Sequence, residues 1–418
     1  MRKSHDGPVS LLLRPDLLRA VLICWLIVEA VILALHLRLE TAVGLTAGGT
    51  LAFGDDTINF WAAARLALLG RVAEVYDFAA FHRFQVGVLG GPIHLYHYSY
   101  PPVAILLTLP LGLLPYGWGV ATWFVGGWIA FSAAVRAAWP ADKHAARDSV
   151  LYAFAAPAVL LNFLTGQTGT WTAAALGGGL MLIGRRPVFA GLLLGTLVAK
   201  PQMALLLPAA LFAGRRWKTL IACGGTAAVL TSVSVAAFGT GPWQDFLARE
   251  PVLRHWILED GAGVWQLFVS VFVGIRHLPA PVPLAYAAQV LAGLIALFLV
   301  VRAWTSGAPA AARHAALVIG GFFATPYLQV YDIVVAALVP LWLLSVLPCG
   351  TARRPGMILA GALLLLAPLL TVVVARVFGV NIGWLLLVPA LAAAMRACRA
   401  GRTECGIARP PALTTPAS

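Results

Sequence analysis

The residues of this sequence with the clearest capacity for chemistry are two adjacent acids, Asp55 and Asp56, and a distant lysine, Lys200. A carboxylate can act as a general base toward a hydroxyl group, and a lysine supplies positive charge where a departing phosphate gains negative charge. Each also has a simpler interpretation. An acid before a helix is often an N-cap, and a lysine near a membrane can extend its charged end toward water.

Other polar side chains occur where apolar runs are broken. They are His94, His97, Tyr98, Tyr100, Gln167, Gln202, Tyr331 and Asp332. His94 and His97 have a spacing that metal ligands use, but no third ligand accompanies them, so a metal site is not expected. Glu29 is an acid inside an apolar run, and we expect it to be a structural partner of a neighbouring span.

The composition indicates which elements must position these residues. Of 418 residues, 61% are hydrophobic and only 11% are charged, whereas soluble domains contain about 45–50% apolar and about 25% charged residues. This excludes an ordinary soluble enzyme, a disordered chain and a secreted disulfide scaffold. The sequence predicts an all-α polytopic membrane protein. Five scattered cysteines, without metal-ligand spacing, predict neither a disulfide framework nor a zinc site.

The net charge of +13 comes from short basic clusters beside apolar runs. This is the pattern of cytoplasmic loops. The sequence contains no basic stripe with interleaved aromatic residues, so nucleic-acid binding is not predicted. With these clusters inside, the external loops are expected at about 38–100 and 239–283. The turns that contain Gln167, Lys200 and Asp332 are then also expected on the external side.

We expect a retained first span over 17–37 and a helix over 59–69 that lies at the membrane surface. Residues 263–275 are predicted to be re-entrant or interfacial. Many later runs are too short to cross alone, which indicates irregular backbone around a cavity. Between 101 and 147, either 103–114 is a half-span or the basic cluster around 136–147 is external. Residues 1–399 form one predicted domain, and 400–418 a disordered cytoplasmic tail.

Several short motifs follow one another in a recognisable order. They are Gly54-Asp55-Asp56-Thr57-Ile58-Asn59-Phe60-Trp61-Ala62-Ala63-Ala64-Arg65, Leu69-Gly70, Val75-Tyr76-Asp77, Tyr100-Pro101-Pro102, Leu109-Pro110-Leu111, Leu114-Pro115, Gly166-Gln167, Lys200-Pro201-Gln202 and Thr325-Pro326. This ordered set resembles glycosyltransferase family 87, which uses polyprenyl-phosphate sugars. The resemblance implies a GT-C-like bundle of about 11–13 transmembrane helices, with an interfacial helix in the long first external loop. It also implies a bacterial inner-membrane enzyme whose active site faces the periplasmic side.

The resemblance further implies transfer of a hexose, with mannose favoured, to a lipid or glycan acceptor. Asp56 stands five residues before Trp61, where the catalytic aspartate of the family falls. One base suits an inverting displacement, because a retaining double displacement needs a nucleophile and a second acid/base. Lys200, with Arg65 and His97, is expected to hold the donor phosphate. The expected substrate-binding residues are Asp55, Tyr100, Gln167, Gln202, Tyr331 and Asp332. The expected partners are the donor, the acceptor and membrane lipids, and no metal or other cofactor is expected.

The pair Tyr331-Asp332 departs from relatives that carry two histidines there, so Asp332 either substitutes in acceptor binding or marks a different acceptor. Two other functions remain open. A transporter or lipid flippase would also use broken spans and the acid Glu29, but no inverted repeat is visible. A structural subunit of an envelope assembly would have no use for paired acids beside an amphipathic helix.

Overall fold

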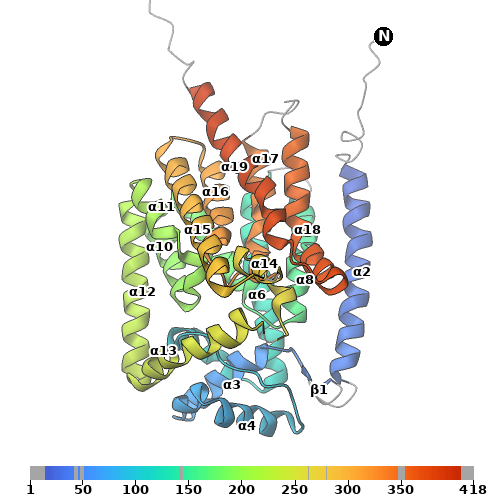
Figure 1. Cartoon of the computed structure of the whole chain (residues 1–418), viewed down its shortest axis with the longest axis vertical. Helices are drawn as coiled ribbons and strands as arrows, with labels where there is room; N and C mark the ends of the chain where they lie inside the picture. Colours follow the sequence, from blue (N-terminus) through green and yellow to red (C-terminus); the bar gives the residue numbers. More distant parts are fainter. Residues whose placement is uncertain are drawn as a thin grey trace, which may run out of the picture.

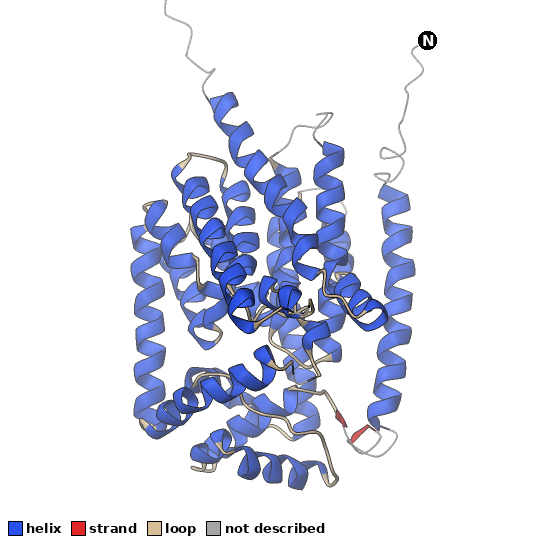
Figure 2. Ribbon diagram, in the orientation of Figure 1, coloured by secondary structure: helices blue, strands red, loops and turns tan. Residues whose placement is uncertain are grey.

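The computed structural model describes residues 15–41, 46–47, 51–140, 145–261, 263–278, 280–346 and 354–405. Within them the chain is mostly helical, with loops between the helices and a hairpin of strands β1 (Thr46–Ala47) and β2 (Leu51–Ala52) (Figure 2). The predicted tail lies outside the described residues from 406 onward, and the last helix continues through Cys405. We call the end of the bundle where α2 begins and α19 ends the terminal end, and the opposite end the loop end (Figure 1).

Six of the described helices are long and apolar enough to cross a membrane. They are α2 (Pro15–Thr41), α6 (Tyr116–Ala138), α12 (Trp217–Phe238), α15 (Val282–Thr305), α18 (Arg354–Phe378) and α19 (Gly383–Cys405). The prediction of an all-α polytopic membrane protein is therefore confirmed. Inside α2, Glu29 is buried and accepts a hydrogen bond from Trp25 one turn earlier (2.6 Å), so its partner is on its own helix. Arg19 pairs with Asp148 at 2.9 Å and links α2 to α7 (Ala145–Phe154).

Shorter segments lie among these helices. They are α7 (Ala145–Phe154), α8 (Pro157–Leu164), α9 (Gly169–Leu182), α10 (Pro187–Gly195), η3 (Thr196–Ala199), η4 (Pro201–Ala204), α11 (Leu207–Ala213), α16 (Ala310–Ala324), η7 (Asp332–Ala337) and α17 (Leu338–Ser345). Proline stands in the first turn of several of them, where its missing N–H costs no helical hydrogen bond. Pro157, Pro187 and Pro201 are examples. These prolines therefore begin new short helices inside the bundle, where a single long helix would otherwise cross it.

The turn at Lys200 lies deeper than the external surface predicted from the sequence. A Cβ at Gly191 would lie 2.5 Å from Ala222, and one at Gly195 would lie 2.5 Å from Thr226. Helix α10 thus runs beside α12 in the same direction, and the end of η3 is level with a point part-way along α12. The segment 187–199 rises about 20 Å, whereas the 22 residues of α12 rise about 33 Å. Two half-length segments therefore meet at Lys200 within the bundle.

The first loop forms a compact cap at the loop end. It contains α3 (Thr57–Leu68), η1 (Val72–Tyr76) and α4 (Phe78–Leu89). The expected helix is present as α3, but most of it is buried against η1, α5 (Pro102–Thr108), η2 (Leu109–Leu113) and α6, and it does not lie open at a membrane surface. Its small side chains allow this approach, since a Cβ at Gly112 would lie 2.8 Å from the backbone of Ala64.

This packing also decides between the two alternatives for 101–147. Segments α5 and η2 are short and pack along α3, whereas α6 is one of the six long spans. The apolar run 103–114 is therefore the half-span, and a single long crossing follows it.

The second loop contains α13 (Gly241–Leu253), the π-helix η5 (Arg254–Glu259), η6 (Trp265–Leu267) and α14 (Val271–Arg276). Its irregular backbone pairs with the segment before Asp332: Val269 N–H donates to the Leu328 carbonyl (2.9 Å), and Val330 N–H donates to the Leu267 carbonyl (2.8 Å). The Asn381 amide donates to the carbonyl of Phe268 (2.7 Å). Non-helical backbone within a membrane requires such partners. These hydrogen bonds hold the segment against the bundle, and its re-entrant or interfacial position stays a prediction.

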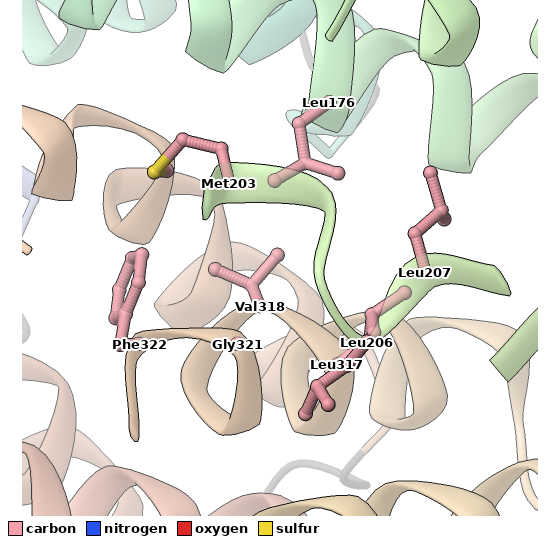
Figure 3. A pocket seen from close by; sticks show the side chains of 8 residues that line it. All are labelled: Leu176, Met203, Leu206, Leu207, Leu317, Val318, Gly321 and Phe322. Atoms are coloured by element: carbon pink, nitrogen blue, oxygen red, sulfur yellow. The ribbon is translucent and has the colours of Figure 1, made fainter. Parts of the chain in front are cut away.

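The main apolar core surrounds α9, α16 and η7. A small pocket lies inside it, and Figure 3 shows apolar side chains from α9, η4, α11 and α16 around it. Its lining residues are Leu176, Met203, Leu206, Leu207, Leu317, Val318, Gly321 and Phe322. The pocket contains no titratable group, so the chemistry of this molecule lies elsewhere.

Candidate active site

Asp56 stands at the N-terminus of α3, in a turn that includes two left-handed residues. Gly54 has φ +76° and Asp55 has φ 45°, a conformation that costs energy for a residue other than glycine. The Asp56 side chain does not cap α3. It accepts hydrogen bonds from the Asn59 amide (3.0 Å) and the Gln167 amide (2.5 Å). The turn therefore directs one carboxylate away from its own helix and toward the α8–α9 turn.

Both amide groups that donate to Asp56 are oriented by further hydrogen bonds. The Tyr100 hydroxyl donates to the Gln167 oxygen (2.8 Å), and the buried Gln85 amide donates to the Asn59 oxygen (3.0 Å). Each amide oxygen is thus occupied, so each NH2 group faces Asp56. The Tyr96 hydroxyl donates to the neighbouring acid Asp55 (2.8 Å). The network fixes Asp56 as an acceptor at the point where α3 meets the bundle.

The turn between α8 and α9 connects the first loop to the segment of Asp332. Gly166 has φ +63°, and a Cβ there would lie 2.2 Å from the Gly54 carbonyl oxygen. A Cβ at Gly169 would lie 2.0 Å from the Tyr331 carbonyl oxygen. No larger residue fits either position without movement of backbone. We call residues 166–169 the central turn, because it touches both the Asp56 turn and the Tyr331 segment.

Lys200 lies on the other side of the central turn. Its Nζ donates to Asp332 (2.5 Å) and to the Thr168 hydroxyl (2.9 Å). The rings of Tyr100 and Tyr331 face the ammonium, with centroids 5.7 and 5.2 Å from Nζ. Lys200 is only 4% exposed and Asp332 only 1%. A buried charge is tolerated when it is paired and hydrogen-bonded, and both residues meet this condition.

The electrostatic environment sets the proton affinity of Asp56. Burial, followed by repulsion from Asp55, raises the pKa of Asp56 to about 8, against the opposing effects of Gln167 and Lys200. A carboxylate with a pKa close to the working pH is an effective general base. Burial lowers the pKa of His97 to about 4, so this imidazole is neutral at pH 7. The site therefore combines a strong carboxylate base with one buried lysine.

Most of the sequence-predicted site residues come together here, and three do not. Asp55, Asp56, Tyr100, Gln167, Lys200, Tyr331 and Asp332 form the network described above. Arg65 lies in the last turn of α3 and donates to the Gly112 carbonyl (3.2 Å). His97 packs between the rings of Phe78 and Trp256. The Gln202 side chain has no hydrogen-bond partner among the described residues.

Four polar residues of the network were not predicted. Asn59 follows Asp56 by three residues, a spacing that places two side chains on one helix face, so the sequence contained a signal for it. Thr168 adjoins the predicted Gln167. Gln85 and Tyr96 had no local signal, because their contacts depend on how α4 and the segment after it fold over α3. Within the described residues, no group of three or more His, Cys, Asp or Glu side chains is arranged to hold a metal ion.

The sequence was compared with models of known protein families. The model of glycosyltransferase family 87 matches residues 98–326, more than half of the chain. The matched region includes Tyr100, Gln167 and Lys200, begins after the Asp55–Asp56 turn and ends before Tyr331. No curated protein and no solved structure gave a match.

Proposed function

Because the chain belongs to glycosyltransferase family 87, we propose that it transfers a hexose, with mannose favoured, from a polyprenyl-phosphate sugar to a lipid or glycan acceptor. We further propose that it acts in a bacterial inner membrane with the loop end on the periplasmic side. The orientation is supported by Arg185-Arg186 and Arg215-Arg216, which lie where short segments turn at the terminal end, as expected of cytoplasmic loops.

In the proposed step, an acceptor hydroxyl oxygen attacks the anomeric carbon of the donor sugar. The bond between that carbon and the phosphate oxygen breaks, and its electron pair leaves with the polyprenyl phosphate. Asp56 takes the hydroxyl proton as general base. A single displacement of this kind inverts the anomeric configuration. The scheme uses side chains of this protein only and includes no metal or other cofactor.

The observation that carries the proposal is the arrangement of Asp56 and Lys200 on two sides of the central turn. Gln167 donates to Asp56, and the adjacent Thr168 accepts from Lys200. A base and a cation are thus held a short distance apart, as transfer from a phosphate-linked donor requires. Lys200 is already paired with Asp332, so an incoming phosphate must share or displace that carboxylate. This gives Asp332 a role in controlling access to the cation.

Reconstitution of the purified protein in liposomes tests the proposed reaction. With a labelled polyprenyl-phosphate hexose and a panel of lipid and glycan acceptors, we expect a labelled glycosidic product. A sugar nucleotide offered in place of the lipid donor should give none. Movement of labelled lipid between leaflets without a new glycosidic bond would instead establish the transporter or flippase alternative and contradict the proposal.

The raised pKa of Asp56 predicts the pH dependence of transfer. A base must be deprotonated to act, so kcat/KM should rise with pH across a window centred near pH 8. The Gln167 hydrogen bond lowers the pKa of Asp56, so Gln167→Leu should move the rise to higher pH. Gln202→Leu is the matched control. The Gln202 side chain makes no hydrogen bond to Asp56 or to any other described residue, so the pH at which the activity of this variant rises should match the wild type, whatever its rate. A profile that is flat from pH 6 to 9 would be incompatible with Asp56 as the titrating base.

A further inference from the structure

Two half-buried arginines lie at the terminal end of the bundle, away from Asp56. Arg216 is the N-cap residue of α12, and Arg313 lies in the first turn of α16. In both side chains the Nε atom is buried and has no hydrogen-bond partner. Guanidinium groups are usually hydrogen-bonded where they are buried, so this pair requires an explanation.

The fold brings the two side chains together around Trp304, at the end of α15. The turn between α11 and α12 packs on this ring, since a Cβ at Gly214 would lie 2.6 Å from it. The Trp304 indole donates to the Arg313 carbonyl (3.1 Å), and the Arg313 guanidinium lies over the same ring at 5.5 Å. Arg313 thus lies over Trp304, and Arg216 follows by two residues the glycine that packs on the same ring, near enough for its charge to act on Arg313.

The electrostatics of this place are unfavourable in the absence of an anion. Burial disfavours the charge of Arg313, the Arg216 charge repels it, and Cys398 opposes these two effects. Both arginine charges also disfavour a positive charge on the adjacent, buried His314. No carboxylate of the described residues forms a salt bridge with either arginine. The N-terminus of α12, a 22-residue helix, adds positive potential at the same position. Desolvated like charges without a counter-ion cost free energy, and an anion would relieve this cost.

The positive charge typical of cytoplasmic loops does not explain why Arg216 and Arg313 are half-buried without hydrogen-bond partners for their Nε atoms. Arg185 and Arg186 on the neighbouring turn are exposed, as are Arg215 and Lys218, and water solvates such side chains. Arg216 and Arg313 differ because they are half-buried and have buried Nε donors without partners, and Arg313 also lies over the ring of Trp304.

We propose that Arg216 and Arg313 form a binding site for a phosphate group at the end of the bundle opposite Asp56. Planar guanidinium groups bind phosphate oxygens in pairs, which suits the two free Nε donors. The phosphate belongs either to the headgroup of an anionic phospholipid or to a small soluble phosphate. This site is separate from the proposed transferase reaction and does not depend on it.

Thermal unfolding of the full-length protein in detergent micelles tests the site. Phosphatidylglycerol, phosphatidylcholine and inorganic phosphate are added in separate series. If a lipid headgroup is the ligand, phosphatidylglycerol should raise Tm by a few degrees and phosphatidylcholine by much less. If a small phosphate is the ligand, inorganic phosphate should raise Tm more than either phospholipid does. No rise with any of the three probes would overturn the proposal.

The double variant Arg216→Gln/Arg313→Gln should lose the rise in Tm. Without added ligand, its Tm should equal or exceed that of the wild type, because the repulsion is removed. A purely structural role for the arginines predicts the opposite, a lower Tm in the absence of ligand.

Arg185→Gln/Arg186→Gln is the matched control and should keep the full rise in Tm on addition of ligand. An equal loss in this control would show that only general surface charge matters, which would overturn the proposal. Arg216→Lys/Arg313→Lys keeps both charges and should show a reduced rise, which tests the paired geometry even if the glutamine variant folds poorly.

Discussion

Replacing Asp56 with asparagine should reduce the initial rate of sugar transfer by about 100- to 10,000-fold, the usual contribution of a general base. Asparagine has nearly the same shape, and the carboxylate does not cap α3, so the fold should be retained. Rates in proteoliposomes with saturating donor and acceptor measure the effect, and an unchanged Tm confirms folding.

The neighbouring acid provides the control. Asp55 accepts from Tyr96 and raises the pKa of Asp56 by repulsion. Asp55→Asn should therefore cause a much smaller loss of rate and move the pH profile toward lower pH. If Asp56→Asn transfers sugar as fast as the wild type, or if Asp55→Asn loses as much activity, the assignment of the base is wrong.

The second large effect is expected at Lys200. Lys200→Met leaves Asp332 as an unpaired carboxylate that is only 1% exposed. Breaking a buried ion pair in this way costs about 3–5 kcal/mol, so the variant should show a markedly lower Tm and no transfer. Loss of transfer in this variant is expected both from the loss of stability and from the loss of the proposed phosphate ligand.

A double variant separates the two roles. Lys200→Met/Asp332→Leu replaces the whole pair by apolar side chains, a change that is often neutral or stabilising. We expect its Tm to return to about the wild-type value while transfer remains absent, because the cation for the phosphate is missing. Recovery of transfer together with stability would contradict a role for Lys200 at the donor phosphate.

Much of the candidate site could be predicted because rare polar residues in an apolar chain mark the places where backbone or substrate needs them. Asp56, Gln167 and Lys200 stood out for this reason, and the structure places them around one turn. Arg65 also stood out, but nine positions along α3 carry it about 14 Å from Asp56. The charge of Arg65 made it a candidate for the donor phosphate, but the rise of the helix separates it from Asp56.

The broken spans could also be recognised in the sequence as short apolar runs. How far each run extends into the bundle could not be predicted. Lys200 was expected at an external turn because the sequence shows only where a run ends. Its true level depends on the contacts of Gly191 and Gly195 with α12, which fix how far α10 extends along its neighbour. Gln85 shows the same limit, because its link to Asn59 arises only when α4 folds over α3.

The pairing of Lys200 with Asp332 has a consequence for the order of biosynthesis. The two residues are 132 positions apart, so during synthesis Lys200 is inserted well before its counter-ion exists. Until the segment with Asp332 arrives and docks on the central turn, the nascent protein carries a lone cation among apolar helices, which is costly. The last third of the chain therefore completes the electrostatics of a site whose proposed base, Asp56, is made among the first sixty residues. A chain that stalls before Asp332 would leave Lys200 without this counter-ion, so the proposed site is complete only when that segment has docked on the central turn.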